Sequence, residues 1–233
     1  MGLGFLLASA AAAEVVSARY IDPTDRYPHG VLGDPSEYTT LEVITAEGQR
    51  IRRTWERPLV YEDTAPRLVD VTGDGSPEVV VVESHERLGA RFAILELRDG
   101  ELTGLVANPF IGTRFRWLAI VGIADFDGDG FTDVAYVDRP HLAKTLRVWR
   151  VRPVSDGTAS VEQVASLPGV TNHRIGEVDI AGGVRDCGAG PEMIVADAGW
   201  SRLLAVAFDG PALAARDLGP HRGRASFVAA MAC

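Results

Sequence analysis

The chain has 233 residues, of which 46% are hydrophobic, and this is enough to bury a full core. Its formal net charge of -9, from 32 acidic and 23 basic residues, argues against a nucleic-acid or anionic-membrane partner, because such binding needs clustered Lys and Arg. No stretch after the N-terminus is long and apolar enough for a membrane helix. We therefore expect a globular protein with no nucleic-acid partner and no membrane span.

The chain begins with an apolar run over residues 1–13 that ends in small residues. Ala-Ser-Ala or Ala-Ala-Ala in this run satisfies the pattern of a signal-peptidase site, although no Lys or Arg precedes it. A buried apolar strand is the alternative. We predict a signal peptide over residues 1–18, a single domain over 19–233, and a periplasmic or secreted location.

Alternating apolar hairpins then recur along the chain, bounded by turn residues. They cover residues 40–55, 92–106, 146–164 and 203–215. An Asp- and Gly-rich loop between two apolar segments precedes each of the last three hairpins, at residues 68–82, 123–137 and, in degenerate form, 178–195. The first aspartates of these loops, Asp70, Asp125 and Asp179, recur at intervals of about 55 residues, within the range of propeller blades.

Each Asp loop with its hairpin supplies four strands, so the sequence contains three complete units. A fourth blade would combine the hairpin at residues 38–56 with a C-terminal inner strand, Ala225–Met231. We therefore predict an all-β fold, which is a four-bladed β-propeller closed by N- and C-terminal strands. We expect the protein to be a monomer. The alternative is an incomplete or larger propeller that completes itself by oligomerising.

The two cysteines are an even count in a chain that we expect to be exported. Cys187 lies in the loop after the innermost strand of the last complete unit, and Cys233 directly follows the expected closing strand. These loops would be neighbours on one face, so we predict a disulfide between them. Two unrelated buried thiols are the alternative.

The loop at residues 125–133 has carboxylates at its first, third, fifth and ninth positions and a backbone carbonyl at its seventh. Its predicted ligands are Asp125, Asp127, Asp129, the carbonyl of Phe131, and Asp133. Ca²⁺ takes roughly six to eight oxygen ligands, and acids so close together repel one another without a cation. An EF-hand is excluded because its glutamate would fall on Tyr136 and a strand follows instead of a helix. The sequence therefore predicts bound Ca²⁺.

The loop at residues 70–78 has the same pattern with fewer charges. Its predicted ligands are Asp70, Thr72, Asp74, the carbonyl of Ser76, and Glu78. We expect it to bind Ca²⁺ more weakly. In the third copy Asp179 and Glu192 are further apart than the corresponding acids of the other loops, and Cys187 lies between them, so we predict no metal there.

These Asp loops, their strand pattern and their period resemble the FG-GAP (VCBS) repeats of integrin α-like propellers, which occur in many secreted bacterial proteins. The resemblance covers residues 30–233. It implies that ions stabilise the blade loops and that ligands bind on the opposite face. The low blade count and the single complete Asp loop depart from the seven-bladed assembly usual in that family.

The loops on the face away from the Asp loops carry the candidate ligand residues. They are Arg67, His85, Arg116, Asp138, His141, His173, Arg174 and Trp200. Arginines facing carboxylates and histidines can bind an anionic or zwitterionic ligand. Structural salt bridges between blades are the alternative explanation for these charges.

We predict that the protein is a binding or scaffolding module for a protein, peptide or glycan. The sequence has no nucleophile elbow, no HExxH motif and no Gly-rich phosphate loop, so it names no catalytic residue. One alternative is a hydrolase or lyase that uses a His/Asp pair such as Asp138 and His141. Another is a structural domain that assembles with itself.

Overall fold

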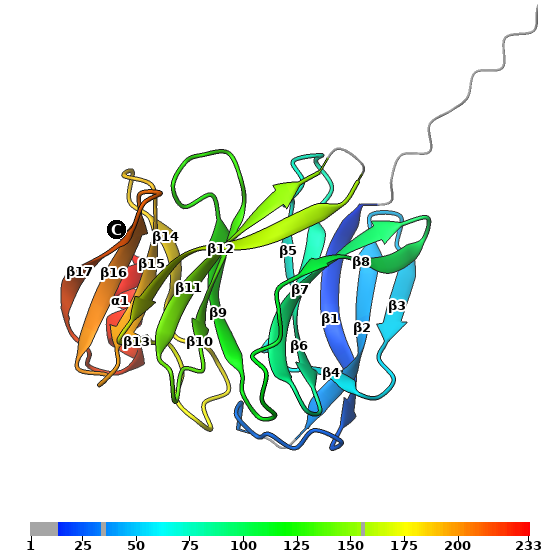
Figure 1. Ribbon diagram of the computed structural model, residues 1–233, viewed down its shortest axis with the longest axis horizontal. Helices are drawn as coiled ribbons and strands as arrows, with labels where there is room; N and C mark the ends of the chain where they lie inside the picture. Colours follow the sequence, from blue (N-terminus) through cyan, green and yellow to red (C-terminus); the bar gives the residue numbers. More distant parts are fainter. Residues whose placement is uncertain (1–13, 34–35, 155–156) are drawn as a thin grey trace, which may run out of the picture.

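The computed structural model describes residues 14–33, 36–154 and 157–233, and antiparallel strands make up nearly all of their regular structure (Figure 1). The strands form three sheets, which follow one another along the long axis of the molecule. The predicted all-β fold is therefore confirmed.

The first sheet has eight strands and merges two of the expected units. Its hydrogen-bonded order is β1-β2-β4-β6-β7-β8, with β3 paired to β2 and β5 paired to β6. The strands are β1 (Val15–Thr24), β2 (Glu37–Thr45), β3 (Arg50–Thr54), β4 (Leu59–Tyr61), β5 (Arg67–Val69), β6 (Glu78–His85), β7 (Gly89–Arg98) and β8 (Glu101–Ala107). Short strand β4 joins the two halves, because it pairs with β2 on one side and β6 on the other.

The middle and last sheets each correspond to one Asp loop with its hairpin. The middle sheet has the order β12-β11-β10-β9, and the last has β13-β15-β16-β17 with β14 paired to β15. The strands are β9 (Leu118–Ala124), β10 (Asp133–Asp138), β11 (Thr145–Pro153), β12 (Ala159–Pro168), β13 (Val170–Thr171), β14 (Gly183–Asp186), β15 (Pro191–Asp197), β16 (Arg202–Phe208) and β17 (Leu213–Pro220).

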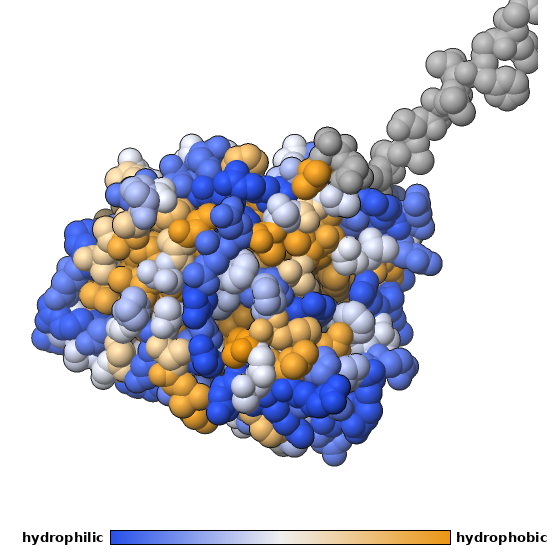
Figure 2. Space-filling model, in the orientation of Figure 1, coloured by the Kyte–Doolittle hydropathy of each residue, from blue (hydrophilic) through white to orange (hydrophobic). Residues whose placement is uncertain are grey.

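Central strands are buried on both faces because each sheet has a hydrophobic core on either side. In β6, Val80 and Val82 face the core shared with the middle sheet, whereas Val79 and Val81 face the core shared with the first hairpin. Such a strand appears in sequence as a continuous apolar run. Hydrophobic side chains accordingly gather along the middle of the side shown in Figure 2, and hydrophilic ones cover its two ends.

The prediction of a closing C-terminal strand is wrong, because Arg224–Met231 forms helix α1. The segment is rich in Ala, which favours helix over strand, and Gly223 precedes it with φ 85°. The helix packs Phe227 against Ile194, Leu203 and Ala205 of the last sheet. Across the described ranges no strand ladder joins β13–β17 to β1, whose recorded partner is β2.

The predicted disulfide is confirmed. Cys187 and Cys233 are bonded, with 5.5 Å between their Cα atoms, and the bond ties the residue after helix α1 to the turn between β14 and β15. The cross-link therefore fixes a helix to the last sheet and does not join two blades.

Most of the predicted signal peptide, residues 1–13, lies outside the described residues, while residues 15–18 belong to β1. The boundary at residue 18 stays a prediction. Within the described part of the chain, α1 does not have the length or hydrophobicity of a membrane-crossing helix.

Candidate functional site

The loop between β9 and β10 folds around the carboxylate of Asp125. Its Oδ1 accepts hydrogen bonds from the backbone N–H groups of Gly128 (2.8 Å) and Asp129 (3.1 Å), and its Oδ2 accepts one from Gly130 (2.9 Å). Gly128 and Gly130 have φ values of 73° and 87°, which L side chains rarely adopt. These bonds hold the backbone curled with its acids on one side.

The loop between β5 and β6 folds in the same way around Asp70. The Asp70 carboxylate accepts the N–H groups of Gly73 (2.7 Å), Asp74 (3.2 Å) and Gly75 (2.9 Å). The repeat seen in sequence is therefore a repeat of backbone geometry. At its end Glu78 is buried, and its Oε2 accepts the Val71 N–H at 2.8 Å.

The acids of the 125–133 loop have a geometry that suits a cation. Asp125, Asp127 and Asp133 offer carboxylate oxygens that lie within 4.8 Å of one another. The Oδ1 atom of Asp127 is buried and has no hydrogen-bond partner, which is costly for a carboxylate oxygen. This oxygen set fits Ca²⁺, a hard cation that prefers carboxylates.

An arginine already contacts three of these acids. Arg150, on β11, places its Nη2 atom 2.7 Å from Asp127 Oδ2, its Nη1 atom 2.5 Å from Asp129 Oδ2, and its Nε atom 3.0 Å from Asp133 Oδ1. Burial alone would lower the pKa of Arg150, but the hydrogen bonds that Arg150 donates to Asp133 and Asp127 outweigh it and raise that pKa. Burial raises the pKa of Asp133, and Arg150 opposes this shift. Arg150 therefore supplies one positive charge where the sequence predicts a metal.

The 70–78 loop has no such arginine. Asp133 pairs with Arg150 across β10 and β11, and in the first sheet Val79 pairs with Leu95, so the equivalent position opposite Glu78 is Glu96. Burial, followed by the charges of Asp74 and Asp70, raises the pKa of Glu78. This loop offers fewer acids, but none of them is neutralised by an arginine in the structure described.

The structure reassigns the first aspartate of the third copy. Arg185 pairs with Glu192 across β14 and β15, as Ala124 pairs with Asp133 across β9 and β10. Asp186 therefore occupies the position of Asp125, and its Oδ1 accepts the N–H of Gly188 at 2.8 Å. The expectation that Asp179 leads this copy is wrong.

The lack of a complete acid set in the third copy has a structural basis. Arg185 and Arg216 bond the carboxylate of Glu192 at 2.9 and 2.7 Å. Asp179 instead pairs with Arg224 at the start of α1. Two arginines thus neutralise the acid that would have closed a metal site.

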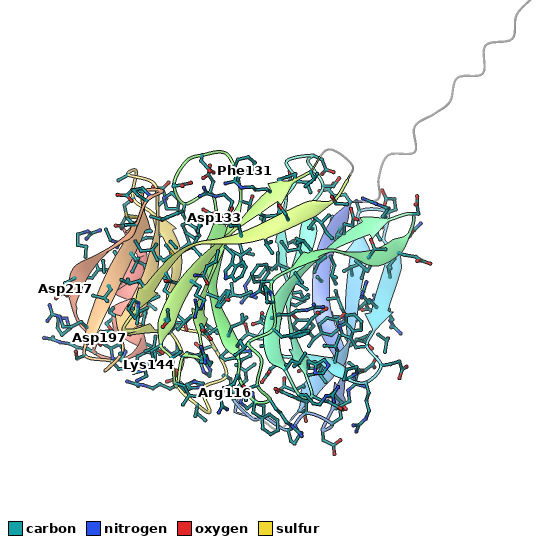
Figure 3. All side chains as sticks on the ribbon, in the orientation of Figure 1. Arg116, Phe131, Asp133, Lys144, Asp197 and Asp217 are labelled. Carbon is teal, nitrogen blue, oxygen red and sulfur yellow. A yellow bond between two sulfur atoms is a disulfide. The ribbon has the colours of Figure 1, made fainter. Side chains whose placement is uncertain are left out.

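A pocket of about 200 Å³ lies at the other end of the sheets. Its walls come from the loop before β9, the loop after β10, and two side chains from further away. They are His29, Phe115, Arg116, Trp117, Arg139, Pro140, His141, Leu142 and Ile175. Figure 3 shows the two ends, with Phe131 and Asp133 at the upper edge and Arg116 at the lower edge.

Two buried residues, Glu62 and Ser84, support one wall of the pocket. His29 Nδ1 lies 2.5 Å from Glu62 Oε1, and the second Glu62 oxygen accepts the Ser84 hydroxyl. Burial raises the pKa of Glu62, while His29 opposes that rise. The His29 ring stacks on Phe115 with 5.1 Å between the ring centroids, so Glu62 fixes both rings.

A histidine pair forms the opposite wall. His173 Nε2 donates to the Glu177 carbonyl at 2.8 Å, so its Nδ1 accepts from His141 Nε2 at 3.0 Å when both rings are neutral. Burial lowers the pKa of His141 to about 4, with His173 adding to the shift, and burial also lowers the pKa of His173. Both rings are therefore neutral near pH 7, and His141 keeps Nδ1 as an acceptor.

The other residues predicted for the ligand face do not line this pocket. Arg67 pairs with Asp63 at 2.5 Å, and Asp138 accepts from Arg139 and Arg147. These contacts are ion pairs within one sheet, and not the salt bridges between blades of the alternative explanation. His141 bonds His173, so the pair Asp138 and His141 is not a hydrogen-bonded dyad.

The remaining candidates stabilise local turns and packing. His85 Nδ1 accepts the N–H of Arg87 at 3.0 Å and closes the turn between β6 and β7. Arg174 lies over the ring of Trp200, 4.3 Å from its centroid. Only Arg116 and His141 among the predicted residues line the pocket, and His173 supports it from behind.

The sequence analysis missed His29, Glu62 and Phe115. His29 lies in a loop outside the repeats, and nothing in its local pattern marks it. A buried Glu at the end of an apolar strand was the available signal for Glu62, which directly follows β4.

Comparison with known families identifies one segment of the chain. The family model of the FG-GAP-like repeat matches residues 70–136, which run from the first aspartate of one loop through the second loop and into β10. No curated protein matches the chain. The resemblance inferred from the Asp loops is thus confirmed for residues 70–136, which match the FG-GAP-like repeat.

Proposed function

We propose that the protein is an exported, Ca²⁺-binding module of the β-propeller type that holds a protein, peptide or glycan at its pocket end. The observation that carries this proposal is the separation of two ends. The Asp loops gather at one end of the sheets, and a pocket lined by aromatic rings, histidines and arginines lies at the other (Figure 3). Metal at one end would stabilise the loops without occupying the ligand site.

Ca²⁺ would be held in the 125–133 loop by Asp125, Asp127, Asp133 and the Phe131 carbonyl, joined by Asp129 if Arg150 releases it. The buried, unpaired Oδ1 of Asp127 supports this assignment. When bound, the ion neutralises acids that otherwise repel one another.

The 70–78 loop is the second proposed site. Its predicted ligands, Asp70, Asp74, Glu78, Thr72 and the Ser76 carbonyl, share the curled backbone of the first loop. The hydroxyl of Thr72 donates to Glu78 at 3.2 Å, so these two side chains lie together at the loop.

The proposed propeller is an incomplete array of blade-like sheets. Successive sheets pack face to face through shared cores, as blades do, but helix α1 takes the place of the expected closing strand. A loop of the first sheet does contact a loop of the last sheet, because the Gly176 N–H donates to the Val31 carbonyl at 3.0 Å. Export is supported by the disulfide, which persists in oxidising compartments.

Partner binding can be tested with charge reversal at the two ends. Arg114→Glu with Arg174→Glu alters the pocket end, and Arg98→Glu with Arg152→Glu alters the Asp-loop end by the same charge. We expect a protein, peptide or glycan retained by the immobilised wild-type chain in Ca²⁺ to be lost with the first variant and kept with the second. Equal retention by both variants would contradict binding at the pocket end.

The metal can be tested by calorimetric titration with Ca²⁺. We expect saturable binding and a higher Tm with Ca²⁺ than with EDTA. Combining Asp125→Asn with Asp127→Asn should remove the binding at the 125–133 loop and its share of the Tm increase, and leave that of the 70–78 loop. The same Tm in Ca²⁺ and EDTA would refute the metal assignment.

A further inference from the structure

Uncompensated positive charge gathers beside the pocket. Arg114, Arg116 and Arg174 have no carboxylate partner among the residues described, whereas Arg139 in the same wall pairs with Asp138. Arg116 Nη1 donates to the Phe115 carbonyl at 2.8 Å, which leaves its other N–H groups available. In a chain of net charge -9, such a group of cations favours an anion at this end.

The pocket walls are apolar, and part of that apolar surface is exposed. Leu142 and Ile175 are 63% and 72% exposed, and both line the pocket together with the rings of Phe115 and Trp117. Large exposed hydrophobic side chains grouped around one hollow are typical of binding surfaces. A ligand group that covers them would be apolar.

The backbone of the pocket is held in an unusual conformation. Phe115 and Arg139 have φ values of 55° and 46°, which are uncommon for residues other than glycine. Tyr27 Oη accepts the Phe115 N–H at 2.8 Å, and the Trp117 carbonyl accepts the Arg139 N–H at 2.9 Å. These contacts fix the positions of the walls before any ligand binds.

A hydrogen-bond acceptor completes the set. The bonds from His141 to His173 and from His173 to the Glu177 carbonyl leave His141 Nδ1 with an accepting lone pair, and the His141 side chain lines the pocket. An amide N–H beside a carboxylate is the donor that would satisfy it. A guanidinium, an apolar wall and an acceptor together match the end of a peptide chain.

We propose that this pocket binds the C-terminal residue of a peptide that ends in a hydrophobic side chain. Arg116 pairs with the terminal carboxylate, and the side chain packs on Leu142, Ile175 and Phe115. His141 Nδ1 accepts the N–H of the last residue. This inference rests on the proposed function and specifies the ligand that the pocket end takes. A free carboxylate joined to an aryl group by a short alkyl chain shares the same chemistry, and the test separates the two sources.

The probes are short peptides titrated into the full chain in Ca²⁺ by calorimetry. We expect N-acetylated diglycyl-phenylalanine with a free carboxylate to bind saturably, and its C-terminal amide to bind at least about tenfold more weakly. A diglycyl-serine acid should lose a similar factor because it lacks the apolar group. If acid and amide bind equally, or no probe binds, the proposal is wrong.

Variants locate the binding. Arg116→Gln should abolish the preference for acid over amide, whereas Arg87→Gln, an exposed arginine at the same end outside the pocket, should leave it unchanged. Ile175→Ser should weaken all hydrophobic probes, whereas Val178→Ser, equally exposed and outside the pocket, should not. Matching effects of target and control variants would overturn the assignment.

A third probe, 3-phenylpropionate, distinguishes a site for peptide C-termini from a site for free organic acids. Binding as tight as that of the peptide acid assigns the pocket to free organic acids, and binding about tenfold weaker assigns it to peptide ends that use the extra N–H. Failure of this inference can be told apart from failure of the proposed function, because the Ca²⁺ titration and the charge-reversal variants test the module whether or not these probes bind.

Discussion

The guanidinium of Arg150 lies 2.7 Å from Asp127, inside the loop whose acids form the most complete calcium pattern in the chain. The side chain is 8% exposed and also contacts Asp129 and Asp133. A metal entering this loop must share or displace these contacts. Arg150 is therefore an internal cation that would compete with the proposed Ca²⁺.

Removing this cation should tighten calcium binding. A charge of one unit and a divalent ion about 6 Å apart repel by about 1.4 kcal/mol even at the dielectric of water, so we expect Arg150→Gln to raise the Ca²⁺ affinity roughly tenfold. Without Ca²⁺ the same variant should lose about 3 kcal/mol of stability, because its buried acids are left unpaired. Calorimetry and urea unfolding measure the two effects.

The control for this prediction is Arg152→Gln. Arg152 lies on the same strand and contacts the Phe131 ring, but it pairs with Glu162 and with none of the loop acids. If both variants raise the Ca²⁺ affinity equally, the effect of Arg150 comes from the net charge, and Arg150 does not compete with Ca²⁺ for the loop acids.

The disulfide should contribute substantially to stability. It joins residues separated by 46 positions, and closing a loop of this size is worth about 3 to 4 kcal/mol in the chain-entropy model. Urea unfolding of wild type and of Cys187→Ser with Cys233→Ser measures the difference. Identical unfolding midpoints would show that the cross-link adds nothing.

Helix α1 should depend on one side chain. Phe227 is 3% exposed and packs on Ile194, Leu203 and Ala205, so Phe227→Ala should cost about 3 kcal/mol. Val228, the next residue, is 72% exposed, and Val228→Ala should change stability by less than about 0.5 kcal/mol. In a strand, Ser226 and Val228 would lie on the same face, opposite Phe227. In a helix, they lie on different faces. Comparing the effects of substitutions at Ser226 and Val228 therefore decides between the two structures.

Stability should fall as the pH drops from about 6.5 to about 4. Burial lowers the pKa of His141 to about 4 in the folded chain, whereas the unfolded chain takes up this proton near the ordinary value of about 6.5. Protons therefore favour the unfolded state across this window, and His173 acts in the same direction. Because solvent screens the partly exposed His141 ring, its contribution should be about 1 kcal/mol, well below the full value of the shift. His141→Gln should reduce the dependence of the urea midpoint on pH between these values. An unchanged dependence would contradict the lowered pKa of His141.

The repeat was predictable because backbone geometry and chemistry coincide in the Asp loops. Asp125 and Asp70 accept the N–H groups of their own turns, so the residues that would bind a metal are also those that shape the loop. The disulfide was predictable from the even count of cysteines, although the strand expected beside Cys233 is helix α1. The fold class therefore depended on local rules that a sequence shows directly.

The C-terminal segment and the pocket depended on contacts between distant residues. A short apolar run such as Ala225–Met231 fits either a strand or a helix, and the packing of Phe227 decides between them. Likewise Arg150 reaches the Asp loop from a neighbouring strand, and His29 meets Glu62 across 33 positions. These contacts join residues that are far apart in the sequence, so no local sequence pattern predicts them.

Cys187 directly follows Asp186, the residue that occupies the Asp125 position in the last sheet, and the disulfide holds Cys233 beside it. A tag or fused domain attached after Cys233 would leave the molecule at the end of the Asp loops. Surface immobilisation through the C-terminus would therefore present the pocket to solution. Attachment after Cys233 would, however, crowd the Asp loops, so metal and ligand titrations require differently tethered samples.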